Sequence, residues 1–214
     1  MPPLLSINNL HTHFFLDEGT VRAVDGVDLE IPRGKTLCLV GESGCGKSIT
    51  AFSLLQMIQR PGKIVDGQIT LHRDNGPVEL TGLPPDGKQM RSIRGSEIAM
   101  IFQEPMTSLS PVHNIGSQIA EAIRLHTDSN RKEAKQHAIH IMERVGIPDA
   151  SRRYDTFPHE LSGGLRQRAM IAMGMGCEPD IIIADEPTTA LDVTIQAQLL
   201  ELLQQQVVEK QTSI

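Results

Sequence analysis

An eight-residue pattern near the N-terminus constrains this chain more than any other feature of its sequence. It reads Gly41, Glu42, Ser43, Gly44, Cys45, Gly46, Lys47 and Ser48, the complete G-x-x-x-x-G-K-[ST] spacing of a phosphate-binding loop. Such a loop requires a strand before it and a helix after it. The apolar run at 36–40 predicts the strand, and apolar residues at helical spacing over 47–58 predict the helix, which Pro61-Gly62 ends.

The chemistry of this loop follows from its residue types. Glycines allow a turn so tight that backbone N–H groups and the helix N-terminus face phosphate oxygens. In that geometry Lys47 reaches the β and γ phosphates, and the Ser48 hydroxyl ligates Mg²⁺. An ordinary glycine-rich turn is the alternative, and it would need the spacing, the lysine and both flanking elements to coincide. The pattern therefore predicts a nucleoside triphosphate site with Mg²⁺.

A second pattern is an apolar strand that ends in two acids, Asp185 and Glu186, after Ile181-Ile182-Ile183-Ala184. In α/β proteins ligands bind at the carboxyl ends of the strands. Asp185 suits the Mg²⁺ shell, and Glu186 is then available as the base or water-positioning group for attack on the γ-phosphate. A solvated helix cap is the alternative.

A third pattern is Leu161-Ser162-Gly163-Gly164. Ser162 is a good N-cap, and the two glycines leave the start of a helix bare, which makes a second anion-binding helix N-terminus. Since one chain has one triphosphate to hold, we expect this helix to face the γ-phosphate bound to another subunit. A plain Ser-Gly-Gly helix cap is the alternative.

Strands that alternate with helices predict an α/β architecture with a largely parallel central sheet. An Asp74-Asn75-Gly76 turn predicts a small antiparallel hairpin. We expect further strands at 4–10, 21–31, 68–71, 78–80, 97–102 and 180–184, helices at 114–125, 131–145, 164–175 and 194–208, and the first residues of another strand at 211–214.

Composition and charge exclude several classes of protein. A net charge of −6 disfavours capture of a nucleic-acid backbone. The three cysteines, expected to be small buried hydrophobic residues, form no CxxC pair, which fits a reducing compartment and predicts no structural zinc. No run approaches the roughly 18 apolar residues of a membrane helix, and the N-terminus lacks signal-peptide features. We expect a cytosolic chain that would need a partner for any membrane role.

Together these patterns resemble the ATP-binding cassette (ABC) ATPases. The resemblance covers essentially the whole chain, 4–214, and adds Gln103 and the Thr189-Ala190-Leu191-Asp192 loop to the three patterns above. It implies an α/β P-loop NTPase fold of the ABC type, with an antiparallel β subdomain near the N-terminus and a helical subdomain at about 104–177.

The resemblance also implies roles for individual residues. Catalytic roles fall to Glu186, Lys47 and Gln103, the last as the glutamine that contacts Mg²⁺ or water and senses a transmembrane partner. It implies Mg²⁺ ligation by Ser48, Gln103 and Asp185. Within one chain it implies nucleotide contacts from the phosphate loop and Ile49. Phe14 would stack on adenine, and core packing is the alternative role of that side chain. Across a head-to-tail dimer the nucleotide would be contacted by Ser162, Gly163, Gly164 and Asp192.

A narrower resemblance rests on the stretch from Phe102 to Pro111 and on Phe157-Pro158-His159-Glu160. Both are similar to the ATPase subunits of dipeptide and oligopeptide importers, from which Ser110 and Leu165 depart mildly. Nickel, glutathione and antimicrobial-peptide systems share the first stretch. The resemblance implies ATP hydrolysis that energises uptake, permease subunits and a second ATPase subunit as partners, a solute-binding protein indirectly, no nucleic acid, and a peripheral place on the cytoplasmic face of the plasma membrane.

One departure from the family is large. The chain ends at Ile214, before the switch histidine of the family could occur, so the sequence is expected to be a cassette truncated before that region. Two alternatives stay open: a soluble cassette ATPase in DNA repair or translation and, because of this truncation, a nucleotide-binding module with little turnover.

Overall fold

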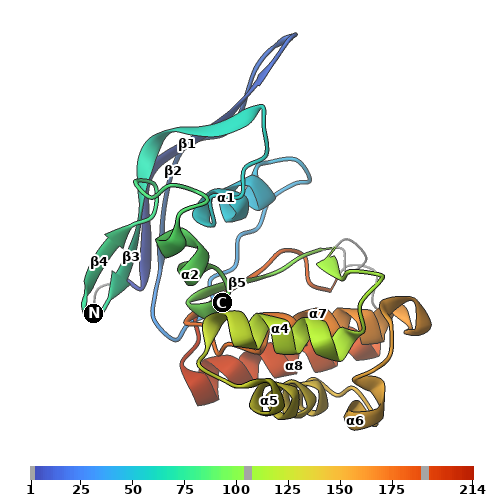
Figure 1. The fold of residues 1–214 in the computed structure, drawn as a ribbon. Coiled ribbons are helices and arrows are strands. Elements are labelled where there is room, and N and C mark those ends of the chain that lie inside the picture. Colours follow the sequence, from blue (N-terminus) through green and yellow to red (C-terminus); the bar gives the residue numbers. More distant parts are fainter. Residues whose placement is uncertain (1–2, 104–107, 189–192) are drawn as a thin grey trace. The chain divides into compact units, whose positions relative to one another are not determined.

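The computed structural model describes residues 3–103, 108–188 and 193–214 of the chain. The described residues fall into two compact units, one that runs up to Arg94 and includes Ser213, and one that runs from Gly95 to Thr212 and includes Ile214 (Figure 1). The phosphate-loop pattern belongs to the first unit. The acidic strand end and the Ser-Gly-Gly pattern belong to the second.

The first unit is built on an antiparallel sheet with the strand order β2-β1-β3-β4. Its strands are β1 (Leu5–Leu16), β2 (Gly19–Ile31), β3 (Gly62–Arg73) and β4 (Gly76–Glu79). The predicted antiparallel β subdomain is confirmed, with strands longer than expected.

The predicted hairpin between β3 and β4 is also present, although its turn differs by one residue. Arg73 pairs with Gly76, so Asp74 and Asn75 form the two-residue loop. Gly76, expected inside the turn, begins β4 instead, with a φ of 117° that favours glycine.

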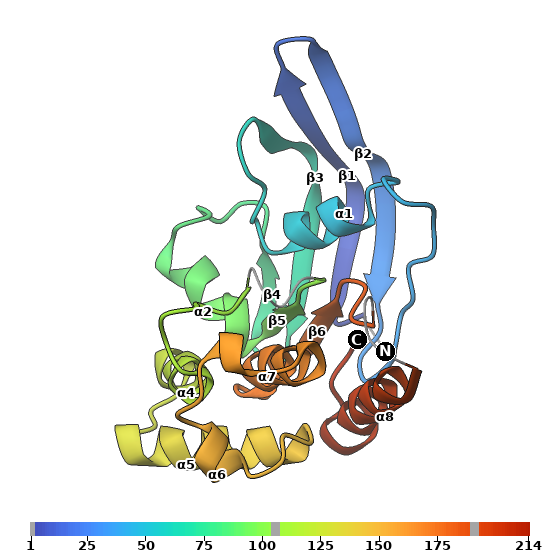
Figure 2. The same cartoon turned by 90° about the vertical axis from the view of Figure 1, so that its right-hand side faces the viewer.

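Helix α1 (Lys47–Leu54) lies against one face of this sheet, where it contacts β1 and β2 (Figure 2). The hydroxyl oxygens of Thr12 on β1 and Ser53 on α1 lie 2.8 Å apart, and both residues are fully buried. This contact fixes the helix that follows the phosphate loop to the middle strand of its sheet.

Helix α1 ends four residues before the predicted end. Gln56 adopts a φ of 49°, its N–H donates to the Ser53 carbonyl, and the Met57 N–H donates to the Phe52 carbonyl. These two bonds are those of a Schellman motif. The guanidinium of Arg94 donates to the Leu55 and Gln56 carbonyls, at 2.7 and 3.0 Å, and completes the end of the helix.

The strand predicted at 36–40, before the phosphate loop, is wrong in this structure. Residues 35–42 carry no strand, and Leu39 and Val40 are 49% and 95% exposed. An apolar run becomes a strand only where a neighbour accepts its backbone hydrogen bonds. Among the described strands none pairs with this segment.

The second unit contains a parallel pair, β5 (Ile98–Ile101) and β6 (Ile181–Ala184). In the described part of the chain this pair is the whole parallel sheet. The expected parallel sheet is therefore present, but it has two strands, and the larger sheet is the antiparallel one of the first unit. Helix α7 (Gly163–Met175) packs on β5, and its Gly174 lies next to the Ile101 side chain. At the predicted strand 211–214 only Ser213 makes a bridge.

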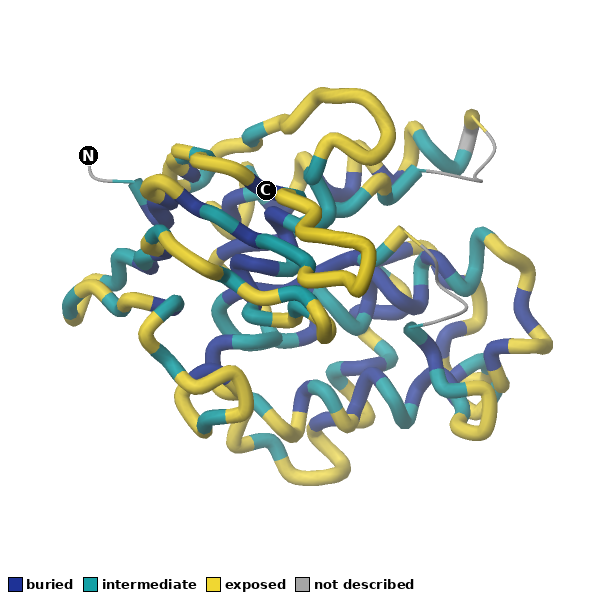
Figure 3. Tube along the Cα trace, turned by 90° about the horizontal axis from the view of Figure 1, so that it is seen from above, coloured by how far each residue is buried: buried dark blue, intermediate teal, exposed yellow. Residues whose placement is uncertain are grey.

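Helices supply the rest of the second unit, and the expected helices at 114–125, 131–145, 164–175 and 194–208 are confirmed within two residues at each end. The four are α4 (Ile115–His126), α5 (Arg131–Arg144), α7 and α8 (Val193–Lys210); two short elements that were not expected are α6 (Ala150–Arg153) and the 3₁₀ turn η1 (Pro158–Glu160). Figure 3 shows buried stretches along the helices and exposed loops between them.

A single apolar core joins these helices. It includes Ile119 and Ile123 of α4, Ala138 and Ile141 of α5, and Met170 of α7, all nearly inaccessible to solvent. None of the described helices is long and apolar enough to cross a bilayer.

Candidate functional site

The phosphate loop leads into α1 through two glycines with left-handed backbone. Gly44 has a φ of 81°, and Gly46, the N-cap of α1, has a φ of 94°. A Cβ at Gly46 would lie 2.3 Å from the Ala23 carbonyl oxygen, so only glycine fits there. The loop itself is exposed, from Gly41 to Cys45.

The ammonium of Lys47 folds back over this loop. Its Nζ donates to the carbonyl oxygens of Gly41 and Glu42, each at 2.9 Å. No side chain caps the N-terminus of α1 at Gly46, and the first turn holds no acidic residue. The positive end of the helix dipole and a lysine therefore converge on the loop, which suits a phosphate group.

The acidic strand end lies in the second unit. The Asp185 N–H donates to the Ile101 carbonyl at 3.0 Å, which extends the pairing of β5 and β6 by one bond. Asp185 is half-buried, while Glu186 is exposed and has a φ of 45°. The two carboxylates thus leave the carboxyl edge of the pair, as the sequence predicts.

Gln103 and Glu186 meet at this edge. The Gln103 Nε2 donates to the Glu186 Oε2 at 2.9 Å, across the ends of β5 and β6. Two predicted site residues that are 83 positions apart in the sequence are therefore in contact. The amide holds the carboxylate in a definite position, and the left-handed backbone at Glu186 is the kind of strained conformation that clusters at functional sites.

Two further glutamines support the segment after Glu186, and the sequence did not single them out. Gln167 of α7 is 2% exposed, and its Nε2 donates to the Pro187 carbonyl at 2.9 Å. Gln196 of α8 donates to the Thr188 carbonyl at 3.1 Å. The sequence did offer one signal for Gln167, because it is a polar residue at a position of α7 that faces the interior.

The Ser-Gly-Gly pattern forms the open start of α7. The Ser162 Oγ accepts from the Leu165 N–H at 3.4 Å, so the predicted N-cap is confirmed. Ser162 and Gly163 are exposed, and a Cβ on Gly163 would meet nothing within 4 Å. The helix N-terminus is therefore accessible to a ligand.

Two further predicted nucleotide-contacting residues, Phe14 and Asp192, remain to be placed. Phe14 is half-buried on β1, and its ring lies so close to Gly62 that a Cβ there would come within 2.6 Å of it. Asp192 and its loop, like residues 104–107, lie outside the described residues.

The cysteines behave differently from one another. Burial raises the pKa of the Cys177 thiol to about 11, and its Sγ contacts the Ala122 carbonyl at 3.5 Å. Cys38 and Cys45 are exposed, so the expectation of three buried cysteines is wrong for these two. Cys38 lies in the segment that forms no strand, and Cys45 lies in the phosphate loop.

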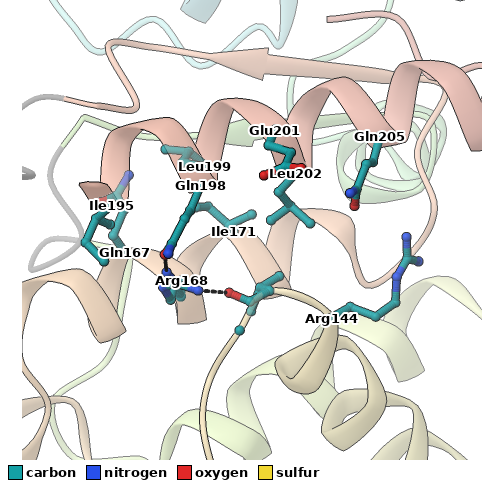
Figure 4. Close-up of a pocket in the computed structure, with 12 residues that line it drawn as sticks. Arg144, Gln167, Arg168, Ile171, Ile195, Gln198, Leu199, Glu201, Leu202 and Gln205 are labelled. Atoms are coloured by element: carbon teal, nitrogen blue, oxygen red, sulfur yellow. Dashed lines mark hydrogen bonds between the residues drawn. The ribbon is translucent and has the colours of Figure 1, made fainter. Parts of the chain in front are cut away.

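A pocket of about 420 Å³ lies between the end of α5 and helices α7 and α8 (Figure 4). Arg168 lines the pocket, and its guanidinium donates to the Val145 carbonyl at 2.6 Å and to the Gln198 side chain. Gln167 lines the same pocket. No sequence pattern predicted it.

Comparison with known proteins gives consistent results. A family model described as ABC transporter matches residues 24–189. A probable peptide ABC transporter ATP-binding protein of Sinorhizobium fredii is 50% identical over 94% of this chain and 58% of its own length. The oligopeptide transport ATP-binding protein AppD of Bacillus subtilis is 49% identical over 100% of this chain and 64% of its own length.

The chain thus spans about 60% of the length of these curated relatives. Among solved structures, a dimeric ATP-binding cassette in a post-hydrolysis state with ADP and Pi aligns with a TM-score of 0.82 at 24% identity, over 97% of this chain and 84% of that one. Since the family match covers most of the chain and the fold agrees with it, the chain belongs to the ABC transporter family.

Proposed function

We propose that this chain is the ATP-binding and ATP-hydrolysing part of an importer for peptides or a related solute. The observation that carries the proposal is the contact between the Gln103 amide and the Glu186 carboxylate at the end of the parallel strand pair. An exposed carboxylate held by a neutral amide, one residue beyond a second carboxylate, is equipped to orient and polarise a water molecule.

In this proposal the phosphate loop holds the nucleotide. The N–H groups of residues 41–49 and the Lys47 ammonium bind the β and γ phosphates. To do so, Lys47 exchanges its bonds to the Gly41 and Glu42 carbonyls for bonds to phosphate oxygens. The ammonium is thus held near its place of action before the nucleotide arrives.

Ser48 and Asp185, with Gln103 directly or through water, would hold Mg²⁺. Hydroxyl, carboxylate and amide oxygens are the hard donors that this ion prefers, so the residue types fit. When bound, Mg²⁺ neutralises charge on the β and γ phosphates. Ser48 and Asp185 belong to different compact units, and their pairing on one ion rests on the family resemblance.

Glu186 is the proposed general base or water-positioning residue. Its carboxylate accepts a hydrogen bond from the attacking water and aligns the water with the γ-phosphorus. Gln103 is the positioning partner in the resting state. Gln167 and Gln196 hold the two carbonyls that follow Glu186, which limits the freedom of that segment.

The open start of α7 supports a head-to-tail dimer. Ser162, Gly163 and Gly164 would contact the γ-phosphate bound to a second ATPase subunit, since each chain carries one phosphate loop of its own. The dimeric state of the cassette with ADP and Pi is consistent with this assignment. We place Asp192 at the same interface and Phe14 near adenine, as the resemblance implies.

The relatives guide the proposal of solute and partners. They are named for peptide and oligopeptide transport, and a glutathione import protein of Escherichia coli is 46% identical over 99% of this chain. We propose permease subunits as direct partners, a solute-binding protein as an indirect one, and a peripheral position at the cytoplasmic face of the membrane.

Nucleotide binding and coupling to a permease test this function. The chain should bind ATP with Mg²⁺, Lys47→Ala should weaken binding by about tenfold or more because one charged contact is lost, and Lys35→Ala should not. Hydrolysis by the chain assembled with peptide permease subunits should rise when peptide and its binding protein are added. ATP binding that ignores Lys47→Ala, or hydrolysis indifferent to permease and peptide, would contradict the proposal.

A further inference from the structure

Two histidines and an aspartate gather on the β1–β2 hairpin, outside the site described above. His11 and His13 are two residues apart on β1, and Asp25 is the direct partner of His11 on β2. One donor atom from each of the three lies within 4.8 Å of the others. The Asp25 Oδ1 is 2.9 Å from the His11 Nδ1 and 3.8 Å from the His13 Nε2.

The strand pleat places this cluster on the sheet face opposite α1. Thr12, between the two histidines, points the other way and bonds to Ser53 of α1. The His11 and His13 side chains are 23% and 16% exposed, and that of Asp25 is 48% exposed. The cluster is therefore sheltered on one side and open to solvent on the other.

One ring nitrogen in the cluster is unsatisfied. The His13 Nε2 is buried and has no hydrogen-bond partner in the described structure. Buried polar side-chain atoms nearly always have a partner, and an unpaired one indicates a missing water or ion. The Asp25 Oδ1, at 3.8 Å from this nitrogen, is too far for a hydrogen bond.

The second nitrogen of His11 is already held in the way typical of a metal ligand. The Asn9 Oδ1 lies 3.1 Å from the His11 Nε2, and an amide oxygen can only accept, so the Nε2 carries the proton. Asn9 is itself fixed, with a φ of 48° and its N–H donated to the Asp28 Oδ1 at 2.8 Å. A metal-binding histidine usually donates its other N–H to such an oxygen.

The opposite side of the His11 ring then needs a positive group. With the proton on Nε2, the neutral ring turns the Nδ1 lone pair toward the Asp25 carboxylate at 2.9 Å. Two acceptors at that distance require a proton or a cation between them. A proton on His11 would satisfy this pair and leave the His13 Nε2 unpaired, whereas a metal ion satisfies all three groups.

We propose that His11, His13 and Asp25 bind Zn²⁺, with solvent at the fourth position. Two imidazoles and a carboxylate are a three-ligand set typical of zinc. In a tetrahedral site with bonds of about 2.0–2.1 Å, donor atoms lie about 3.4 Å apart, which is between the 2.9 and 3.8 Å separations present here. The sequence analysis considered only cysteines as zinc ligands and predicted no structural zinc. The pattern that indicates this site is His-x-His on one strand with an aspartate opposite it on the next.

The charges around the cluster permit a cation. The Arg22 Nη1, 3.6 Å from the Asp25 Oδ2, belongs to a 66% exposed side chain that can turn into solvent. On β3, Asp66 lies opposite His11 and Lys63 opposite His13, and the Lys63 ammonium lies over the Phe15 ring.

Titration of the chelator-treated chain with Zn²⁺, followed by calorimetry, tests this site without reference to ATP. We expect one ion per chain, at least tenfold weaker binding in His13→Gln, and 10- to 100-fold weaker binding in Asn9→Gly, which keeps the backbone conformation and removes the second-shell acceptor. The control is His137→Gln with His140→Gln on α5, a histidine pair at helical spacing, which should bind zinc as the wild type does.

Co²⁺ used in place of Zn²⁺ identifies the ligands by absorption. Bands of nitrogen and oxygen ligation alone would support the site, and a thiolate charge-transfer band would assign the ion to an exposed cysteine and overturn it. No bound zinc in the wild type, or equal affinity in wild type and Asn9→Gly, would also overturn it. Circular dichroism confirms the fold of each variant, and since both substitutions lie on a half-exposed strand face, either variant alone decides the outcome.

Discussion

The buried hydroxyl pair between β1 and α1 gives a stability prediction whose sign and size follow from the hydrogen-bond pattern. The Ser53 Oγ lies 2.7 Å from the Ile49 carbonyl and 2.8 Å from the Thr12 Oγ1. A carbonyl can only accept, so Ser53 gives its proton to Ile49, and Thr12 must donate to Ser53. Both residues are 0% exposed, so water cannot replace either partner.

The two single substitutions therefore differ. Thr12→Val removes a donor and leaves Ser53 bonded to Ile49, so it should cost about 0.5–1.5 kcal/mol, the net value of one hydrogen bond. Ser53→Ala leaves the buried Thr12 hydroxyl without an acceptor and should cost about 1–3 kcal/mol. In the double variant no hydroxyl is left unpaired, so its cost should fall below the sum of the two by about 1 kcal/mol.

Urea denaturation of the wild type, the two single variants and the double variant measures this coupling. Thr20→Val, at an exposed position of β2, is the control and should change the free energy of unfolding by less than about 0.5 kcal/mol. Costs that add to within about 0.3 kcal/mol, or a larger loss for Thr12→Val than for Ser53→Ala, would refute the assigned direction of the bond.

Three further predictions concern the second unit. Gly116→Ala should destabilise the protein by about 1–3 kcal/mol in thermal unfolding, because the added Cβ would lie 2.2 Å from the Tyr154 ring, and an unchanged midpoint would show that the ring can move away. Burial raises the pKa of the Cys177 thiol to about 11, so at pH 8 Cys177 should react with a thiol reagent more slowly than the two exposed cysteines, and equal rates would contradict its burial. The pKa of Glu178 is lowered chiefly by its hydrogen bond with Lys210, so the stability that this pair contributes should be present above about pH 5 and be lost as the pH falls through the folded pKa. Lys210→Met should remove that pH dependence, and an acid unfolding profile identical to that of the wild type would disprove the pair.

Local patterns predicted the elements whose signals lie within a few residues. The α5 helix begins at a capping box in which Asn130 and Glu133 bond to each other's backbone N–H groups, and this signature is visible in the sequence. The end of α1 could not be predicted in this way. It depends on the left-handed Gln56 and on Arg94, which reaches carbonyls 38 and 39 positions away.

The same distinction separates the parts of the candidate site. The phosphate loop and the two acids were predicted because the pattern and the chemistry occupy consecutive residues. The Gln103–Glu186 contact depends on the parallel register that pairs Ile101 with Ala184, and the His11–Asp25 pair depends on a hairpin with register shifts. Neither register can be read from one strand alone.

The strand expected at 36–40 shows the converse case. Its apolar residues satisfy the local pattern, yet strand formation depends on a partner, and no described strand provides one. Local composition therefore predicted the segment's propensity and not its pairing.

The most direct test of the proposed mechanism is the rate of phosphate release at saturating ATP and Mg²⁺ by Glu186→Gln. The amide keeps the shape of the side chain but cannot accept a proton, so release should fall by about 10²–10⁴-fold while ATP affinity is unchanged. Glu178→Gln, an acid that pairs with Lys210 in the same unit, is the matched control and should keep the wild-type rate. A Glu186→Gln variant that releases phosphate as fast as the wild type would contradict the assignment of Glu186 as the residue that activates water.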